Sequence, residues 1–241
     1  MRAWALAALD LVFPALCPVC EATLAAGRRD PLCGACWRAI RRLGPPACER
    51  CGLPLPTFEP TPGPAGLCGG CLGERPAWDW ARAAAEYEGV ARDALHAFKF
   101  HGKRALARPL GALLLEEWGP WLAAAGIDAL VPVPLARGRE RERGFNQAAL
   151  VAERLAAGLG MPLRPRWLVR ARATRPQTDL GAAERRANVR GAFAADTAVA
   201  GRHVALVDDV LTTGATAAEC ARILKAAGAA RVGVLTVARV L

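Results

Sequence analysis

A short segment near the C-terminal end combines an apolar run with acidic and hydroxyl side chains. Residues 204–216 read VALVDDVLTTGAT, so two adjacent aspartates, Asp208 and Asp209, follow a sequence typical of a buried strand. The Thr- and Gly-rich turn after them leads into an Ala-rich stretch that predicts a helix. Backbone N–H groups of a turn that enters a helix bind anions, and the helix dipole assists them. The segment therefore predicts an anion site bordered by two carboxylates.

The two aspartates restrict the kind of ligand. Two carboxylates would repel a bare phosphate, but they would accept hydrogen bonds from hydroxyl groups of the same ligand, or help to hold a metal ion. A sugar phosphate has both parts. A helix-capping role would explain one aspartate but not two. The segment contains neither the GxxxxGK[ST] pattern of a Walker A loop nor the GxGxxG fingerprint of dinucleotide-binding proteins.

Eight of the nine cysteines form four C-x-x-C pairs, separated by twelve, eleven and sixteen residues. A two-residue spacing lets one turn direct two thiolates at one ion, and two such pairs complete a closed, structural zinc shell. Joining the first pair to the second and the third to the fourth needs the shortest loops, while the spacing also allows a cross-braced arrangement. The predicted ligands of two Zn²⁺ ions are Cys17, Cys20, Cys33, Cys36, Cys48, Cys51, Cys68 and Cys71.

The N-terminal segment MRAWALAALDLVFPALC resembles an export signal only superficially. Asp10 interrupts its apolar run and no A-x-A-like cleavage site follows. We therefore expect a cytoplasmic protein, whose reducing surroundings favour zinc over disulfides. No run of about 18 apolar residues predicts a membrane span. The remaining cysteine, Cys220, is expected to be a small buried residue of a helix.

The chain divides near residue 75 into two regions of different composition. The first, 1–75, is predicted to hold a short amphipathic helix and a double zinc ribbon, because residues 17–71 are rich in Pro and Gly and poor in core residues. The second, 76–241, alternates apolar strands with helices, which predicts an α/β domain with a parallel sheet flanked by helices. Ligands of such sheets bind beyond the carboxyl ends of the strands. The expected strands are 127–134, 203–210 and 231–240, and the expected helices are 145–160 and 215–229.

The positive charge of the chain is unevenly distributed. The formal net charge is +10, and residues 135–190 contain thirteen arginines against five acidic residues. This stretch favours a phosphate-bearing ligand or a nucleic acid as partner. Each arginine taken singly is also compatible with a solvated surface position.

The segment VALVDDVLTTGAT resembles the phosphoribosyl pyrophosphate signature of type I phosphoribosyltransferases. A wider set of motifs resembles the ComF family (competence protein F), in order and over nearly the whole chain. These motifs are the four C-x-x-C pairs, FKFHG (98–102), VPVPL (131–135), RERGFNQ (141–147), PQTDL (176–180) and RRANVRGAF (185–193).

The resemblance implies a type I phosphoribosyltransferase-like fold that binds phosphoribosyl pyrophosphate with Mg²⁺. Asp208 and Asp209 would contact the ribose hydroxyls as the catalytic pair. The VPVPL turn takes the place of the pyrophosphate loop but lacks the small, glycine-containing turn of many relatives. The implied 5′-phosphate ligands are Thr212, Thr213, Gly214, Ala215 and Thr216. Candidates for the pyrophosphate or for the flexible loop over the site, at residues 172–193, are Lys99, Lys103, Arg137, Arg143, Arg175, Gln177, Arg185 and Asn188.

The same resemblance implies a role in natural transformation, in the uptake and processing of single-stranded DNA with a helicase partner. Two interpretations stay open at this point. The first is a Mg²⁺-dependent phosphoribosyltransferase whose acceptor the sequence does not identify. The second is a non-catalytic DNA- and helicase-binding adaptor that keeps the phosphoribosyl site as a sensor or a relic. The two are compatible, and we expect both to hold in part.

Overall fold

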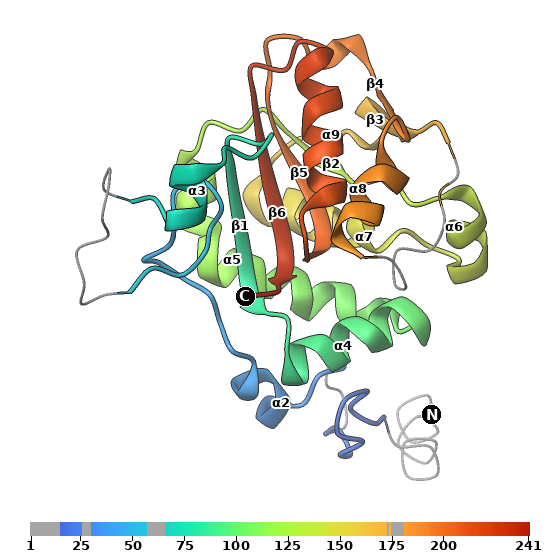
Figure 1. Ribbon diagram of the computed structural model, residues 1–241. Helices are drawn as coiled ribbons and strands as arrows, with labels where there is room; N and C mark the ends of the chain where they lie inside the picture. The colour runs from blue at the N-terminus through green and yellow to red at the C-terminus, as the bar shows by residue number, and fades with distance from the viewer. Residues whose placement is uncertain (1–14, 26–29, 57–65, 173, 175–180) are drawn as a thin grey trace.

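A four-stranded parallel sheet forms the centre of the molecule (Figure 1). The computed structural model describes residues 15–25, 30–56, 66–172, 174 and 181–241, so the predicted N-terminal helix lies outside the described residues. The strand order is β1-β6-β5-β2, and every neighbouring pair is parallel. The predicted parallel sheet is thus confirmed. The strands are β1 (Trp80–Glu86), β2 (Ala129–Pro132), β5 (His203–Leu211) and β6 (Arg231–Arg239).

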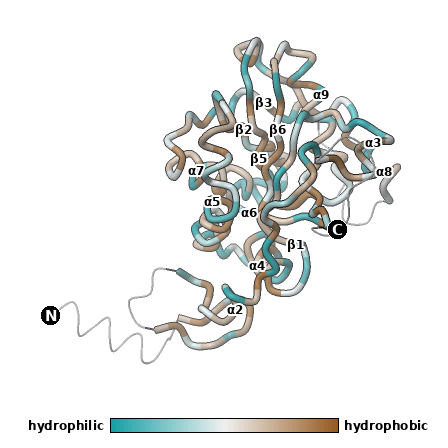
Figure 2. The backbone as a smooth tube through the Cα atoms, turned by 90° about the vertical axis from the view of Figure 1, so that its left-hand side faces the viewer, coloured by the Kyte–Doolittle hydropathy of each residue, from teal (hydrophilic) through white to brown (hydrophobic). Residues whose placement is uncertain are grey.

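Helices cover both faces of this sheet. In β5, Val204 and Leu206 pack into one apolar cluster while Ala205 and Val207 pack into another, so the strand is buried on both sides. Figure 2 shows the strands as hydrophobic segments inside the molecule. The first cluster includes α9 (Ala215–Ala226), and the second includes α4 (Gly89–Phe100), α5 (Ala107–Ala124) and α7 (Gln147–Leu159).

The remaining elements lie around the sheet. The predicted strands and helices recur with shifted ends; α7, for example, ends at Gly160 in the left-handed conformation, whereas α9 stops three residues before the expected end. An unpredicted antiparallel pair of three-residue strands carries α8 between its members. Among the described residues no helix is long and apolar enough to cross a membrane. The elements that lie around the sheet are η1 (Arg104–Leu106), α6 (Arg137–Arg143), η2 (Pro165–Trp167), β3 (Leu168–Arg170), α8 (Ala182–Val189), β4 (Phe193–Ala195) and η3 (Thr197–Val199).

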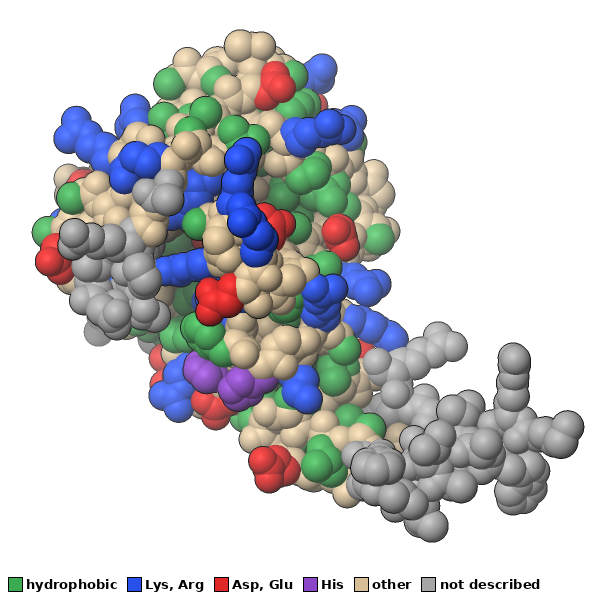
Figure 3. All heavy atoms as spheres, turned by 90° about the vertical axis from the view of Figure 1, so that its right-hand side faces the viewer, with side chains coloured by type: hydrophobic (Ala, Val, Ile, Leu, Met, Phe, Trp, Pro, Cys, Tyr) green, Lys and Arg blue, Asp and Glu red, His purple; other side chains and the backbone are tan. Residues whose placement is uncertain are grey.

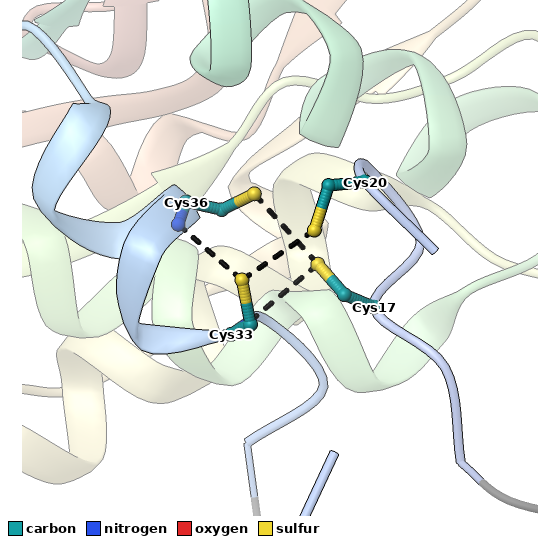
Figure 4. A group of neighbouring side chains, drawn as sticks. All are labelled: Cys17, Cys20, Cys33 and Cys36. Atoms are coloured by element: carbon teal, nitrogen blue, oxygen red, sulfur yellow. Dashed lines mark hydrogen bonds between the residues drawn. The ribbon is translucent and has the colours of Figure 1, made fainter. Parts of the chain in front are cut away.

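The eight paired cysteines form two four-thiol groups, and the pairing is sequential. The first group joins Cys17 and Cys20 to the pair at the start of α2 (Gly34–Ala39), and all four sulfurs point to a common centre (Figure 4). The second group uses Cys48 and Cys51 with the pair around α3 (Gly69–Gly73). This arrangement excludes the cross-braced alternative.

The geometry of both groups fits zinc. Within each group the sulfur atoms lie within 4.8 Å of one another, and Sγ of Cys17 lies 3.9 Å from Sγ of Cys36. A tetrahedral zinc with Zn–S bonds of about 2.3 Å separates its sulfurs by about 3.8 Å. Backbone N–H groups donate to the sulfurs, as Cys68 N does to Cys48 Sγ at 3.4 Å. Burial opposes ionisation, but such N–H groups lower the pKa of Cys17 and Cys48 to about 6, which favours the metal-binding thiolate.

The ribbon region is joined to the edge of the sheet by backbone hydrogen bonds. Leu43 N donates to Ala84 O at 2.8 Å and Glu86 N donates to Arg41 O at 2.9 Å, so residues 41–43 run antiparallel to β1. Figures 1 and 2 show α2 and the first ribbon next to α4. The predicted boundary at residue 75 is therefore crossed by main-chain pairing, and separate folding of 76–241 stays a prediction.

Two arginines of the sheet attach to the second ribbon. Arg82 is only 6% exposed and donates from Nη1 to Glu49 O at 3.0 Å. Arg239 donates from Nη1 to Cys51 O at 2.6 Å. The Arg82 guanidinium also lies 4.4 Å from the ring centroid of Trp121. The fold of the second ribbon therefore provides the backbone acceptors for one buried and one half-buried guanidinium group.

Replacing one cysteine of the second group tests both the metal assignment and this connection. Cys68→Ser should reduce bound zinc from two ions per chain to one, because three thiols leave the shell open. It should also lower the melting temperature by roughly 6–12 °C, since two hydrogen bonds to charged groups contribute about 1.5 kcal/mol each. Metal analysis and calorimetric melting measure the two effects. Cys220→Ala, outside both groups, is the control that retains two ions; unchanged zinc in Cys68→Ser would contradict the ligand assignment.

Candidate active site

A cavity of about 350 Å³ lies at the carboxyl ends of the strands, where the sequence placed the ligand. Asp208 and Asp209 at the end of β5 line it together with the whole segment 212–216. Val133, Pro134 and Leu135 of the VPVPL segment, which follow the end of β2, also line the cavity. The VPVPL segment and the segment 208–216 therefore line one cavity.

The turn between β5 and α9 has the backbone form of an anion-binding loop. Gly214 is the N-cap of α9 with a φ of 74°, and a Cβ atom there would lie 2.7 Å from Cη2 of buried Trp78. Both the left-handed conformation and this close contact require glycine. Ala215 N lies 3.4 Å from Thr213 Oγ1. The first N–H groups of α9 thus border the cavity, where the helix dipole favours negative charge.

Lys99 and the two aspartates form the charged centre of the cavity. Nζ of Lys99, in the last turn of α4, lies 3.0 Å from Oδ1 of Asp209, and both side chains are largely buried. Asp209 N donates to Oδ1 of Asp208 at 2.9 Å. Lys99, a candidate for the pyrophosphate or the flexible loop, lies in the cavity and forms an ion pair with Asp209. One of the two carboxylates is therefore neutralised inside the protein.

The surroundings of Asp208 and Lys99 shift the pKa of both groups. Burial, and then the negative charge of Asp209, raise the pKa of Asp208 to about 7. Burial disfavours the charge on Lys99, but the Asp209 carboxylate outweighs it and raises the pKa of Lys99. At neutral pH the cavity therefore holds the Lys99–Asp209 pair beside an Asp208 that titrates near pH 7.

Four arginines add positive charge around the aspartates. Arg139 and Arg143 come from α6, Arg170 from β3 and Arg185 from α8. Figure 3 shows basic side chains gathered on the face of the molecule that carries α6 and α8. With Lys99, the described lining holds five cationic side chains against two acidic ones, which suits a polyanionic ligand.

Three buried polar atoms that line or adjoin the cavity have no hydrogen-bond partner among the described residues. They are Nε2 of Gln147, Oγ1 of Thr236 and Nε of Arg170. Gln147 is 2% exposed and Thr236 is 1% exposed, and all three residues line the cavity. Because an unsatisfied buried polar group costs about 1–3 kcal/mol, these atoms are suited to a bound ligand.

Asn146 and Gln147 show how RERGFNQ contributes to the site. Asn146 caps α7 by accepting from Ala148 N at 3.0 Å, and its amide donates to Val133 O at 3.1 Å. This second bond fixes the VPVPL segment to the start of α7. Gln147 follows directly and faces the cavity. The motif therefore positions the turn expected to face pyrophosphate.

Not every predicted residue lies in the cavity. Arg143 and Arg185 line it, but Lys103, Arg137 and Asn188 are not among its described lining residues, and Arg137 lies at a separate shallow depression beside Glu140. The sequence analysis did not single out Gln147, Arg170, Thr236 and Tyr87, which distant elements bring to the cavity. Arg175 and Gln177 lie outside the described residues.

Comparison with known proteins identifies both regions of the chain. Residues 8–72 match the family described as a double zinc ribbon domain, and residues 146–241 match the phosphoribosyl transferase domain family. Among solved structures, the glutamine phosphoribosylpyrophosphate amidotransferase of B. subtilis superposes with a TM-score of 0.38 and 25% identity, over 54% of this chain and 25% of that one.

Relatives match the chain over most of its length. DNA utilization protein YhgH of Escherichia coli (strain K12) is 37% identical over 96% of this chain and 100% of its own length. Competence protein F of Haemophilus influenzae is 31% identical over 88% of this chain and 91% of its own length. The chain therefore belongs to the family of proteins that join a double zinc ribbon to a phosphoribosyl transferase domain, together with DNA utilization protein YhgH and competence protein F.

Proposed function

We propose that the cavity binds phosphoribosyl pyrophosphate with Mg²⁺, and that the cationic face around it binds single-stranded DNA in a competence or DNA-utilization role. The observation that carries the first part is the meeting of the Asp208–Asp209 pair, the 212–216 turn and five cationic side chains in one cavity. The names of the relatives and the basic stretch 135–190 support the second part.

Each part of the sugar phosphate has a counterpart in the cavity. The 5′-phosphate fits the 212–216 turn at the N-terminus of α9. The ribose hydroxyls fit the carboxylates of Asp208 and Asp209, because each hydroxyl donates one hydrogen bond. The pyrophosphate fits the side of Arg139 and Arg143, next to the VPVPL segment.

The chemistry that this arrangement supports is displacement at the anomeric carbon. The bond from that carbon to the pyrophosphate oxygen breaks, pyrophosphate leaves with the electron pair, and an acceptor forms the new bond. Mg²⁺ bound to the pyrophosphate oxygens would neutralise the leaving group's charge. The chain's own contribution is to hold the ribose at Asp209, whose position Lys99 fixes, and to place guanidinium groups beside the departing charge.

A second function, as an adaptor without turnover, is favoured by the distribution of the arginines. Arg137, Arg141 and Arg186 are exposed outside the cavity lining, on the two helices that supply Arg139 and Arg185 to it. Basic side chains therefore extend from the cavity rim over the surface, as a strand-binding face requires.

Loss of the aspartate pair should weaken ligand binding strongly. Asp208→Asn with Asp209→Asn should weaken binding of phosphoribosyl pyrophosphate with Mg²⁺ by roughly a hundredfold or more, because two hydrogen bonds to charged groups contribute about 1.5–3 kcal/mol each. Titration calorimetry measures the affinity. Asp93→Asn, which removes an exposed carboxyl of α4 outside the cavity lining, is the matched control. Equal binding by the double variant and the native chain would refute the proposed site.

The raised pKa of Asp208 predicts a pH dependence of binding. As pH rises through 7, Asp208 ionises and repels a polyanion, so affinity for phosphoribosyl pyrophosphate in Mg²⁺-free buffer should fall by up to about tenfold per pH unit. The ligand's own phosphates titrate in the same way whether the native chain or Asp208→Asn is used. The difference between the affinities of the two proteins from pH 6 to pH 8 therefore isolates the Asp208 carboxyl. Parallel pH profiles would show that Asp208 does not face the ligand's charge.

Strand binding should depend steeply on salt if arginines contact phosphates. Arg139→Gln with Arg143→Gln should reduce the slope of log affinity against log salt concentration by about 1.4, since each phosphate contact contributes about 0.7 on a single strand. Fluorescence anisotropy with a labelled oligothymidylate gives the slope. Arg202 directly precedes β5, at the end of the strand away from the cavity, so Arg202→Gln should leave the slope unchanged. A slope that the double variant does not alter would exclude this face.

A further inference from the structure

Phe100, the last residue of α4, is an exposed aromatic ring at the rim of the cavity. It is 53% exposed and also lines the cavity. Among the Phe, Trp and Tyr residues that the structure describes, it alone is exposed; Trp78 and Trp80, for example, are buried. A single exposed apolar side chain is unremarkable in itself, so its meaning depends on what surrounds it.

The neighbours of Phe100 are cationic or aromatic. The Arg143 guanidinium lies 5.0 Å from the ring centroid, and the His96 ring lies 4.7 Å away at an interplanar angle of 43°. The His101 ring in turn lies 5.3 Å from that of His96. Residues 94–115 contain four Lys and Arg and no acidic residue. In Figure 3, histidine side chains lie among hydrophobic, basic and acidic ones on this face.

This combination is more typical of a nucleic-acid contact than of a protein contact. A protein interface needs a contiguous apolar patch, whereas the ring of Phe100 lies beside a guanidinium and an imidazole. A single strand alternates flat bases with phosphates, so it fits an exposed ring between cations. Half of the Phe100 side chain stays accessible with both neighbours in place, which leaves surface for a base.

We propose that Phe100 is a stacking platform for a nucleobase of a single strand, at the point where the strand passes the mouth of the phosphoribosyl cavity. Arg143 would hold one side of the ring and contact an adjacent phosphate. The platform joins the cavity to the basic surface of α6, because Arg143 belongs to both. This inference rests on the proposed binding of single-stranded DNA.

Removing the aromatic ring while keeping an apolar side chain tests the platform. Phe100→Leu in the full, zinc-loaded chain should weaken binding of a labelled oligothymidylate by about fivefold or more, the lower end of the contribution of one stacked base. Binding of an abasic strand of the same length should not change, nor should the salt slope, because no phosphate contact is lost. Phe100→Trp should restore or increase the affinity for oligothymidylate. Leu72→Ala, which removes another exposed apolar side chain from α3, is the control.

The outcomes separate this inference from the function on which it rests. If the native chain binds neither strand, single-strand binding fails and the platform fails with it. If the native chain binds oligothymidylate and Phe100→Leu binds equally well, the function stands and the platform is refuted. If Phe100→Leu weakens both strands alike, the ring acts through the fold of α4 and not through a base, which also refutes the platform.

Discussion

The pairing of Lys99 with Asp209 is the interaction around which the cavity is organised. Two adjacent carboxylates at the inner end of a buried strand would repel each other strongly without a cation beside them. The 3.0 Å contact neutralises one of them, and it requires the C-terminal turn of α4 to reach the carboxyl edge of the sheet. The pKa of the other carboxyl group, Asp208, is raised to about 7 by burial and by the charge of Asp209.

The elements around that edge all contribute positive charge. Helix α6 supplies Arg139 and Arg143, strand β3 supplies Arg170, and α8 supplies Arg185. None of these elements belongs to the central sheet, whose strands contribute the carboxylates and the turn. The scaffold therefore presents the groups suited to the ribose, and its surrounding elements present the groups suited to the phosphates and to a strand. The two proposed activities share one set of guanidinium groups.

Local patterns made much of this structure predictable. Three of the patterns extend over only a few residues each: the apolar run before Asp208, the turn at 212–216 and the four C-x-x-C pairs. Their spacing was therefore enough to predict the end of the strand and the metal ligands. The partner of Lys99 was not predictable, because 110 residues separate it from Asp209 in the sequence. Gln147 and Thr236 reach the cavity only through helix and strand packing. The three-residue strands β3 and β4 were too short to show a periodic pattern, and no sequence signal indicated that residues 41–43 would pair with β1.

The pairing of residues 41–43 with β1 has a consequence for the aggregation of the protein when its metal is lost. At the other edge of the sheet β2 is also covered, because backbone hydrogen bonds join Leu130 to Pro162 and Arg164. On the near side the cover of β1 is the segment between Cys36 and Cys48, which connects the two zinc groups. An uncovered strand edge is a template for pairing with another chain. Zinc binding therefore reduces the tendency to aggregate, because the segment between the zinc ligands covers the open edge of an apolar strand.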